Sequence, residues 1–233
     1  GIDWTQDEQG IHIHFASSDE IRQWSEGEVR VSDGSLVELP NPNAMGHIEL
    51  ATPVCHIWLV KPAFKPWIRL REQALGLNPK EFEKVVYCKG HIITDPGDTN
   101  LQLKQLLDNG SYKAKREELG DQFKALTGGE AIRWLWTQVD MRAIVNSDAA
   151  DVASLAREVR DAGIHPEVMV MDVIPVVPAS IRPTLPVSQK YDVESEIGET
   201  VTSDLNALYQ EVIFRNDRVR RLIELKAPEA VIC

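Results

Sequence analysis

Side chains that could do chemistry are few in this sequence. Asp95 and Asp98 are the one acidic pair set on a tight turn, and clustered carboxylates are what metal-assisted phosphoryl transfer requires. The Pro96-Gly97 step between them is typical of a turn that follows a strand, so we interpret the pair as turn chemistry. The sequence holds no glycine-rich phosphate loop and no Gly-x-Ser-x-Gly nucleophile elbow. We therefore expect no catalytic residues in this chain.

The histidines and cysteines make a weak case for a metal site. His12 and His14 share one face of the strand expected at 11–16, and two histidines can begin a metal site. A third ligand is not evident beside them. The three cysteines are scattered instead of spaced as metal ligands: Cys55, Cys88 and Cys233. We predict no metal site in this chain, and reduced thiols as in the cytoplasm.

The composition is that of a soluble globular chain. Over 233 residues, 25 basic and 36 acidic side chains give a formal net charge of −11, and 43% of the residues are hydrophobic. These values exclude a disordered, collagen-like or disulfide-rich chain. No stretch approaches the roughly 18 apolar residues of a membrane helix. Because an acidic chain does not bind nucleic acid by bulk charge, any such contact needs a local basic patch.

The hydrophobic pattern predicts an α+β fold, mostly helical with short strands. Strands are expected at 11–16, 47–50, 53–60, 91–94 and 169–177. Helices are expected as a pair within 66–88, over most of 99–162, and from 204 to 226. Loops are expected at 32–46, which is rich in turn-forming residues, and at 187–202, which is acidic.

The last helix carries an apolar stripe with the three–four spacing of a coiled-coil seam. The seam consists of Leu205, Leu208, Val212, Val219 and Leu222. Leaving such a side chain in water costs about 1.5–3 kcal/mol. We therefore expect the seam to be buried against a partner.

Arginines on the same helix form the strongest positive patch of the chain: Arg215, Arg218, Arg220 and Arg221. One interpretation is a solvated helix face, which is what most charge runs are. The other is a docking site, because a guanidinium binds carboxylates bidentately and its stem packs against apolar groups. The residues alone leave both interpretations open.

Two sequence blocks indicate a family. One is MGHIELATPVCHIW, from Met45 to Trp58, and the other runs from Thr202 to Glu229 with SDLNALY, VIFRNDR and APE inside it. Both resemble the N-terminal clamp region of the bacterial RNA polymerase beta-prime subunit. Further blocks resemble the same subunit in the same order, so the resemblance covers nearly the whole chain: 16–29, 87–97 and 173–183.

The chain departs from that family at three places. The family carries a four-cysteine zinc module where residues 30–44 stand here, and this stretch has no cysteine for a tetrahedral zinc site. The loop at 187–202 resembles the family's lid in position but is longer and more acidic. The family's magnesium loop, Asn-Ala-Asp-Phe-Asp-Gly-Asp, is absent from the chain.

The resemblance implies five segments along the chain. They are an N-terminal strand and helix (1–31), a linker in place of the zinc module (32–46), the clamp body (47–186), a lid-like loop (187–202), and the first arm and tip of the clamp helical hairpin (203–233). The second arm would follow the end of this chain. We therefore expect the last helix to pair with a second copy, to pack on its own domain, or to fray.

By resemblance, the chain is a non-catalytic clamp portion of DNA-dependent RNA polymerase, a cytoplasmic nucleotidyltransferase. It would line the DNA/RNA channel and help to dock the sigma factor in transcription. The implied docking residues are Arg215, Asn216, Arg218 and Arg221. The lid-like loop contributes Lys190, Tyr191, Asp192, Glu194 and Glu196. The implied partners are the beta and alpha subunits, sigma, and DNA and RNA through the assembly, with magnesium bound elsewhere and no cofactor or membrane contact in this chain.

An alternative belongs to a different class of protein. The chain could be a free-standing interaction protein derived from beta-prime, which binds sigma or another transcription factor without joining a polymerase. The missing zinc module and the acidic lid-like loop favour it. A third, weaker interpretation is a split beta-prime subunit whose remaining residues are encoded separately.

Overall fold

A computed structural model describes residues 2–7, 10–15, 19, 21–22, 45–60, 65–146, 148–163, 165–186, 200–227 and 229–232. The chain forms two compact units. The helical unit is built from residues 52–172 together with residues 2–17, and the ribbon unit combines residues 18–51 with residues 173–232. Helices mixed with antiparallel strands confirm the predicted α+β class. No helix within these ranges is both long and apolar enough to cross a membrane.

The first strands form a hairpin of β1 (Ile2–Asp7) and β2 (Gly10–Phe15). The pairing is antiparallel, from Ile2 opposite Phe15 to Asp7 opposite Gly10. Strand β2 confirms the strand predicted at 11–16. Strand β1 was missed, because its sequence IDWTQD has only two apolar residues and gives little alternation.

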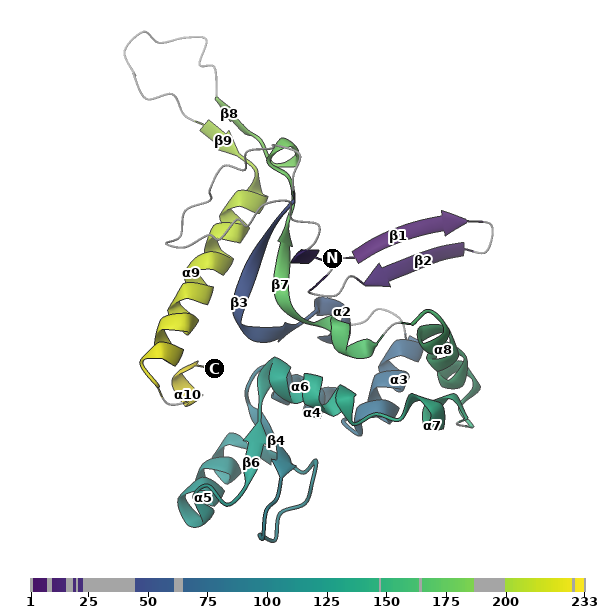
Figure 1. The fold of residues 1–233 in the computed structure, drawn as a ribbon, viewed down its shortest axis with the longest axis vertical. Helices are drawn as coiled ribbons and strands as arrows, with labels where there is room; N and C mark the ends of the chain where they lie inside the picture. Colours follow the sequence, from purple (N-terminus) through teal and green to yellow (C-terminus); the bar gives the residue numbers. More distant parts are fainter. Residues whose placement is uncertain are drawn as a thin grey trace. The chain divides into compact units, whose positions relative to one another are not determined.

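Strand β3 (Gly46–Cys55) pairs with β7 (Val170–Val176) in a two-stranded ribbon (Figure 1). Strand β7 confirms the prediction at 169–177. The prediction of separate strands at 47–50 and 53–60 is wrong, since β3 runs through Pro53 and the chain then enters helix α2 (Ile57–Val60). Proline fits because, among the described residues, β3 pairs with a strand on one side only. A short apolar run such as 57–60 reads equally well as strand or buried helix.

The core of the helical unit lies among helices of moderate length. They are α3 (Lys65–Leu75), α4 (Pro79–Val86), α6 (Gly128–Thr137), α7 (Met141–Val145) and α8 (Ala150–Asp161), with the short 3-10 helix η1 (Pro166–Met169) before β7. Helices α3 and α4 confirm the two predicted within 66–88. A capping box begins α4: the Asn78 side chain accepts from the N–H groups of Lys80 and Glu81, and Glu81 accepts from the Asn78 N–H.

A three-stranded antiparallel sheet in the helical unit has the order β5-β4-β6. Strand β4 (Gly90–Asp95) confirms the strand predicted at 91–94. Strands β5 (Leu106–Asp108) and β6 (Lys124–Leu126), on either side of α5 (Asn109–Leu119), were missed. They interrupt the stretch 99–162, which is otherwise mostly helical as predicted. Three residues are too few to show alternation. These strands are held instead by contacts among buried Ile93, Leu107 and Phe123.

The turn after β4 confirms that Asp95 and Asp98 belong to turn chemistry. The Asp95 carboxylate accepts a hydrogen bond from the Gly97 N–H at 3.0 Å. Gly97 has a φ of +54°, and a Cβ there would lie 2.0 Å from the Gln122 carbonyl oxygen. Only glycine fits this backbone.

Arg71 links α3 to α2 inside the core of the helical unit. Its side chain is 2% exposed, and Nη1 donates to the carbonyl oxygens of Leu59 and Val60, the last residues of α2. The guanidinium carbon also lies 4.1 Å from the centroid of the Phe82 ring. Burial lowers the pKa of Arg71. Carbonyls at the end of a helix have no partner within it, so the guanidinium satisfies groups that burial would otherwise leave unpaired.

We predict that Arg71→Met lowers the free energy of unfolding by about 1–3 kcal/mol, because two carbonyls lose their donor while side-chain volume is kept. Arg71→Ala should cost about 2–5 kcal/mol, since it also opens a cavity. Chemical denaturation followed by tryptophan fluorescence measures both losses. The matched control is Arg157→Met on the exposed side of α8, expected within about 0.5 kcal/mol of the unchanged chain. An equally small loss for Arg71→Met would contradict the role of Arg71.

The ribbon unit continues from β7 into a second pair of strands and the last helices. Its elements are η2 (Ala179–Ile181), β8 (Thr184–Pro186), β9 (Thr200–Thr202), α9 (Asp204–Glu224) and α10 (Glu229–Ile232). Strands β8 and β9 pair antiparallel, with Thr184 opposite Thr202. Helix α9 confirms the last helix predicted from the sequence.

Candidate functional site

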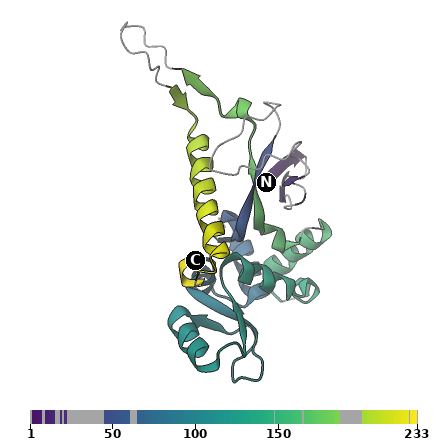
Figure 2. The same cartoon turned by 60° about the vertical axis from the view of Figure 1, so that its left-hand side comes forward.

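Helix α9 carries the predicted docking residues, and its packing decides which of them are available. The helix has 21 residues and begins after Ser203, whose side chain accepts from the Leu205 N–H. It runs alongside the β3–β7 ribbon in both views (Figures 1 and 2). In the structure α9 packs on its own domain, which is one of the three outcomes expected from the sequence.

One stripe of α9, which we call the inner stripe, faces the ribbon. Its members recur every three or four positions and so share a face: Asn206, Tyr209, Ile213, Asn216 and Arg220. Ile213 is 1% exposed and packs against Ile48 of β3 and Val176 of β7. The other four members are polar or carry a hydroxyl, and each of them forms hydrogen bonds.

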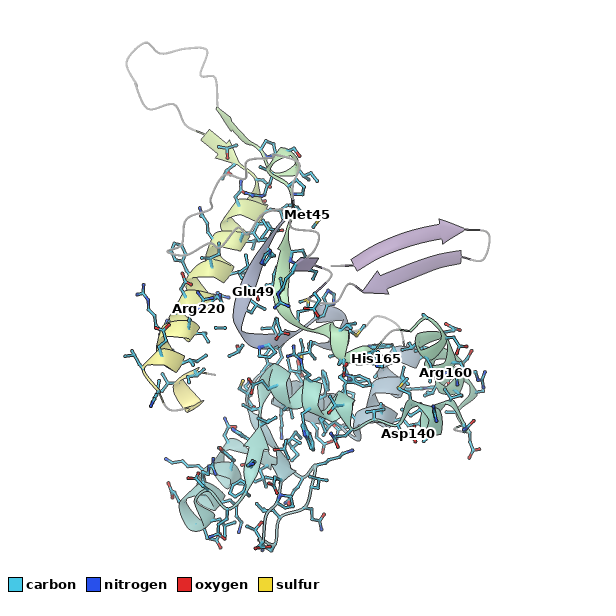
Figure 3. All side chains as sticks on the ribbon, in the orientation of Figure 1. Met45, Glu49, Asp140, Arg160, His165 and Arg220 are labelled. Carbon is cyan, nitrogen blue, oxygen red and sulfur yellow. The ribbon has the colours of Figure 1, made fainter. Side chains whose placement is uncertain are left out.

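Asn216 joins α9 to the backbone of β3. Its Oδ1 accepts from the Ala51 N–H at 2.7 Å, and its Nδ2 donates to the Glu49 carbonyl at 2.8 Å. Arg220, one turn further along, donates to the same carbonyl at 3.4 Å (Figure 3). The Glu49 side chain is used separately, since its carboxylate accepts two hydrogen bonds from Arg22, at 2.7 and 2.9 Å.

Tyr209 joins α9 to the end of β7. Its hydroxyl donates to the Pro175 carbonyl at 3.3 Å and accepts from the Val177 N–H at 3.2 Å. Both partners are backbone groups. The two ends of the inner stripe are therefore tied to different strands, Asn216 to β3 and Tyr209 to the segment that ends β7.

Asn206 and Arg182 connect the start of α9 to the β8–β9 pair. Arg182 donates from Nη1 to Asn206 Oδ1 at 2.7 Å and from Nε to the Val177 carbonyl at 3.0 Å. The Asn206 amide nitrogen donates to the Arg182 carbonyl and to Thr202 Oγ1. Asn206 is 8% exposed, and both atoms of its amide are paired.

The predicted docking residues divide into two groups. Arg215, Arg218 and Arg221 are exposed, and Arg215 forms an ion pair with Glu211 one turn earlier. Asn216 is half-buried and its amide is bound to β3. The structure therefore brings three of the four predicted residues together on the exposed side of α9, which we call the outer face.

The predicted seam lies to one side of the inner stripe. Leu205 and Leu208 are 38% and 56% exposed, whereas the others are half-buried: Val212, Val219 and Leu222. Sequence reasoning left out Phe214 and Leu225, which are 61% and 78% exposed. Pairing of the seam with a second helix stays a prediction.

The end of α9 is fixed by a Schellman motif. Lys226 has a φ of +53°, its N–H donates to the Ile223 carbonyl, and the Ala227 N–H donates to the Leu222 carbonyl, both at 2.9 Å. A residue other than glycine holds the left-handed position here. The predicted end of the helix near 226 is confirmed.

The remaining site predictions concern residues outside α9. The lid-like loop residues lie outside the described residues: Lys190, Tyr191, Asp192, Glu194 and Glu196. Within the described ranges, no three His, Cys, Asp or Glu side chains gather as a metal site would need. Burial raises the pKa of the Cys55 thiol to about 12, so this thiol stays protonated at neutral pH and is a poor metal ligand.

A family model for RNA polymerases matches the C-terminal part of the chain. The model is described as RNA polymerase Rpb1, domain 1, and it matches residues 135–233, which include β7 and α9. This part of the chain is therefore similar to RNA polymerase subunits.

Curated relatives named DNA-directed RNA polymerase subunit beta-prime align with most of the chain. The protein of Ligilactobacillus salivarius is 34% identical over 291 residues, covering 95% of this chain and 22% of the relative. The proteins of Enterococcus faecalis and Nitrosospira multiformis are 39% and 38% identical, each over 81% of this chain and 16% and 14% of the relative. The chain is similar to the beta-prime subunit over most of its own length, and it spans less than a quarter of the length of these relatives.

We predict that Asn206→Ala lowers the free energy of unfolding of the ribbon unit by about 1–3 kcal/mol, because Arg182 and two acceptors lose a buried partner. Hydrogen exchange of the β9 and α9 amides, read with chemical denaturation, measures the loss. Thr184→Val is the matched control: it removes one exposed hydroxyl contact, of 3.2 Å to Thr202, and should cost less than about 0.5 kcal/mol. Equal losses in the two variants would show that the buried amide has no special part.

Proposed function

We propose that this chain serves as the non-catalytic clamp portion of the beta-prime subunit of DNA-dependent RNA polymerase, where it lines the DNA/RNA channel. The observation that carries the proposal is the alignment of 95% of the chain with a beta-prime subunit at 34% identity. Nucleotide addition and its magnesium ions would belong to other parts of the assembly. The beta and alpha subunits would be direct partners in the cytoplasm, and DNA and RNA would be bound through the assembly.

The outer face of α9 is the part of the chain that we assign to sigma docking. Exposed Arg215, Arg218 and Arg221 are flanked by two exposed apolar side chains, Phe214 before them and Leu225 just after the end of α9. Arginine beside apolar surface suits a partner helix with carboxylates and an apolar stripe, because the guanidinium pairs with acids while its stem packs. Arg215 already forms an ion pair with Glu211, so we expect Arg218 and Arg221 to contribute more than Arg215 to sigma binding.

Charge reversal tests this docking surface. We predict that Arg218→Glu with Arg221→Glu raises the Kd for the sigma factor about 10- to 100-fold, since two attractive contacts become repulsive. Titration of labelled sigma with the full chain at two salt concentrations measures the effect, and the salt dependence should fall as well. The matched control, Arg142→Glu with Arg157→Glu, makes the same change in net charge on exposed positions of α7 and α8. Equal weakening by both pairs would refute a local docking surface.

A second candidate is the free-standing interaction protein derived from beta-prime. The alignment of 291 residues is longer than the 233-residue chain, so the relative holds residues that this chain lacks. That difference favours a chain reduced from the full subunit. It agrees with the absence of cysteine from 30–44, where the family's zinc module would stand.

Copurification separates the two candidates. We predict that the tagged full chain, recovered from its native cells, brings beta and alpha subunits in stoichiometric amounts by mass spectrometry. A separate catalytic piece beside them would identify a split subunit. Sigma alone, or no transcription protein, would overturn the polymerase assignment and leave the free-standing interaction protein.

A further inference from the structure

We infer that Asn216 is a positioning residue, which with Tyr209 sets the register and rotation of α9 on the β3–β7 ribbon. The register follows from the contacts of the ribbon unit alone. Its consequence for docking rests on the proposed function, because the same register directs Arg215, Arg218 and Arg221 away from the ribbon. The inference changes the part assigned to Asn216, from a docking contact to a residue that orients the docking surface.

The Asn216 amide takes the place of a peptide group from a neighbouring strand. The Ala51 N–H and the Glu49 carbonyl lie two residues apart on the edge of β3 and bind the two ends of one amide, at 2.7 and 2.8 Å. An unpaired strand edge presents such groups in fixed positions. Since one bond needs an acceptor and the other a donor, the amide fits in a single orientation.

Tyr209 supplies a second fixed point two helical turns earlier. Seven residues separate it from Asn216, so both lie on the inner stripe. Its hydroxyl is bound between the Pro175 carbonyl and the Val177 N–H, at 3.3 and 3.2 Å. Two fixed points on different strands define both the position of the helix along its axis and its rotation.

The apolar contact that lies between Tyr209 and Asn216 cannot by itself set the position and rotation of α9. Its buried centre is Ile213 with Ile48 and Val176, against which Ile174, Tyr209 and Val212 pack. Hydrophobic contact has no direction. A slide of α9 by one turn, about 5.4 Å, would bring another half-buried side chain, that of Tyr209, close to the position that Ile213 now holds. Such a slide would break both bonds of Asn216 and both bonds of Tyr209, because their partners are backbone atoms that cannot follow.

The test measures position and binding separately on the full chain. Spin-labelled amino acids are placed at Ser180 and Glu224, both exposed in the ribbon unit, and pulsed electron resonance gives the distance between them. We expect Asn216→Leu with Tyr209→Phe to shift or broaden this distance by about 5 Å, the rise of one turn. The Kd for sigma should rise about tenfold if one molecule in ten keeps the docking orientation. Ile213→Val is the matched control, because it weakens the apolar contact without removing a directional bond.

The outcomes distinguish the register from the docking proposal. A distance unchanged in the double variant and in Ile213→Val overturns the inference, whatever the change in stability. A shift accompanied by weaker binding supports it. A shift with unchanged binding, while Arg218→Glu does weaken binding, refutes the link between register and docking. A shift with binding unaffected by either variant removes the docking proposal and leaves the register in place.

Discussion

The edge of β3 that faces α9 is the constraint on which the ribbon unit depends. A two-stranded ribbon is marginal by itself, and its outer backbone groups need partners. Helix α9 meets that need with side chains, since Asn216 and Arg220 bind the backbone of residues 49 and 51. An apolar contact centred on Ile213 lies beside these bonds. Hydrogen bonds to strand backbone therefore hold this helix together with apolar burial.

The helices and strands that could be predicted from the sequence are those with local sequence signals of their own. Helix α4 has Asn78, Pro79 and Glu81 at its start, and the capping box follows from their spacing. Strands β5 and β6 have no such signal, because three residues show no period and their pairing with β4 joins positions far apart in sequence. The strand prediction for residues 57–60 failed for a related reason. This apolar run fits strand and helix alike, so tertiary contacts, such as the hydrogen bond from Arg71 to the Leu59 carbonyl, decide which of the two forms.

The candidate site was predicted in part. Exposure of Arg215, Arg218 and Arg221 agrees with a surface role, which charge on a helix generally implies. The face that packs was predicted only in part: Val212 of the seam packs against the Ile213 cluster, but a search for apolar spacing passes over Asn206 and Asn216. A search for polar residues at the same three–four spacing around one isoleucine would have found the inner stripe. Partners in β3 and β7 lie outside the reach of any local pattern.

The use of backbone atoms by Asn216 has a consequence for how this chain tolerates change. Glu49 and Ala51 contribute a carbonyl and an N–H, which nearly every amino acid possesses. Their side chains can thus be exchanged without loss of the bond, and only proline at 51, which lacks an N–H, removes it. The two sides of the contact therefore differ in what they require: the ribbon can accept many residues at positions 49 and 51, whereas the helix needs the amide of Asn216.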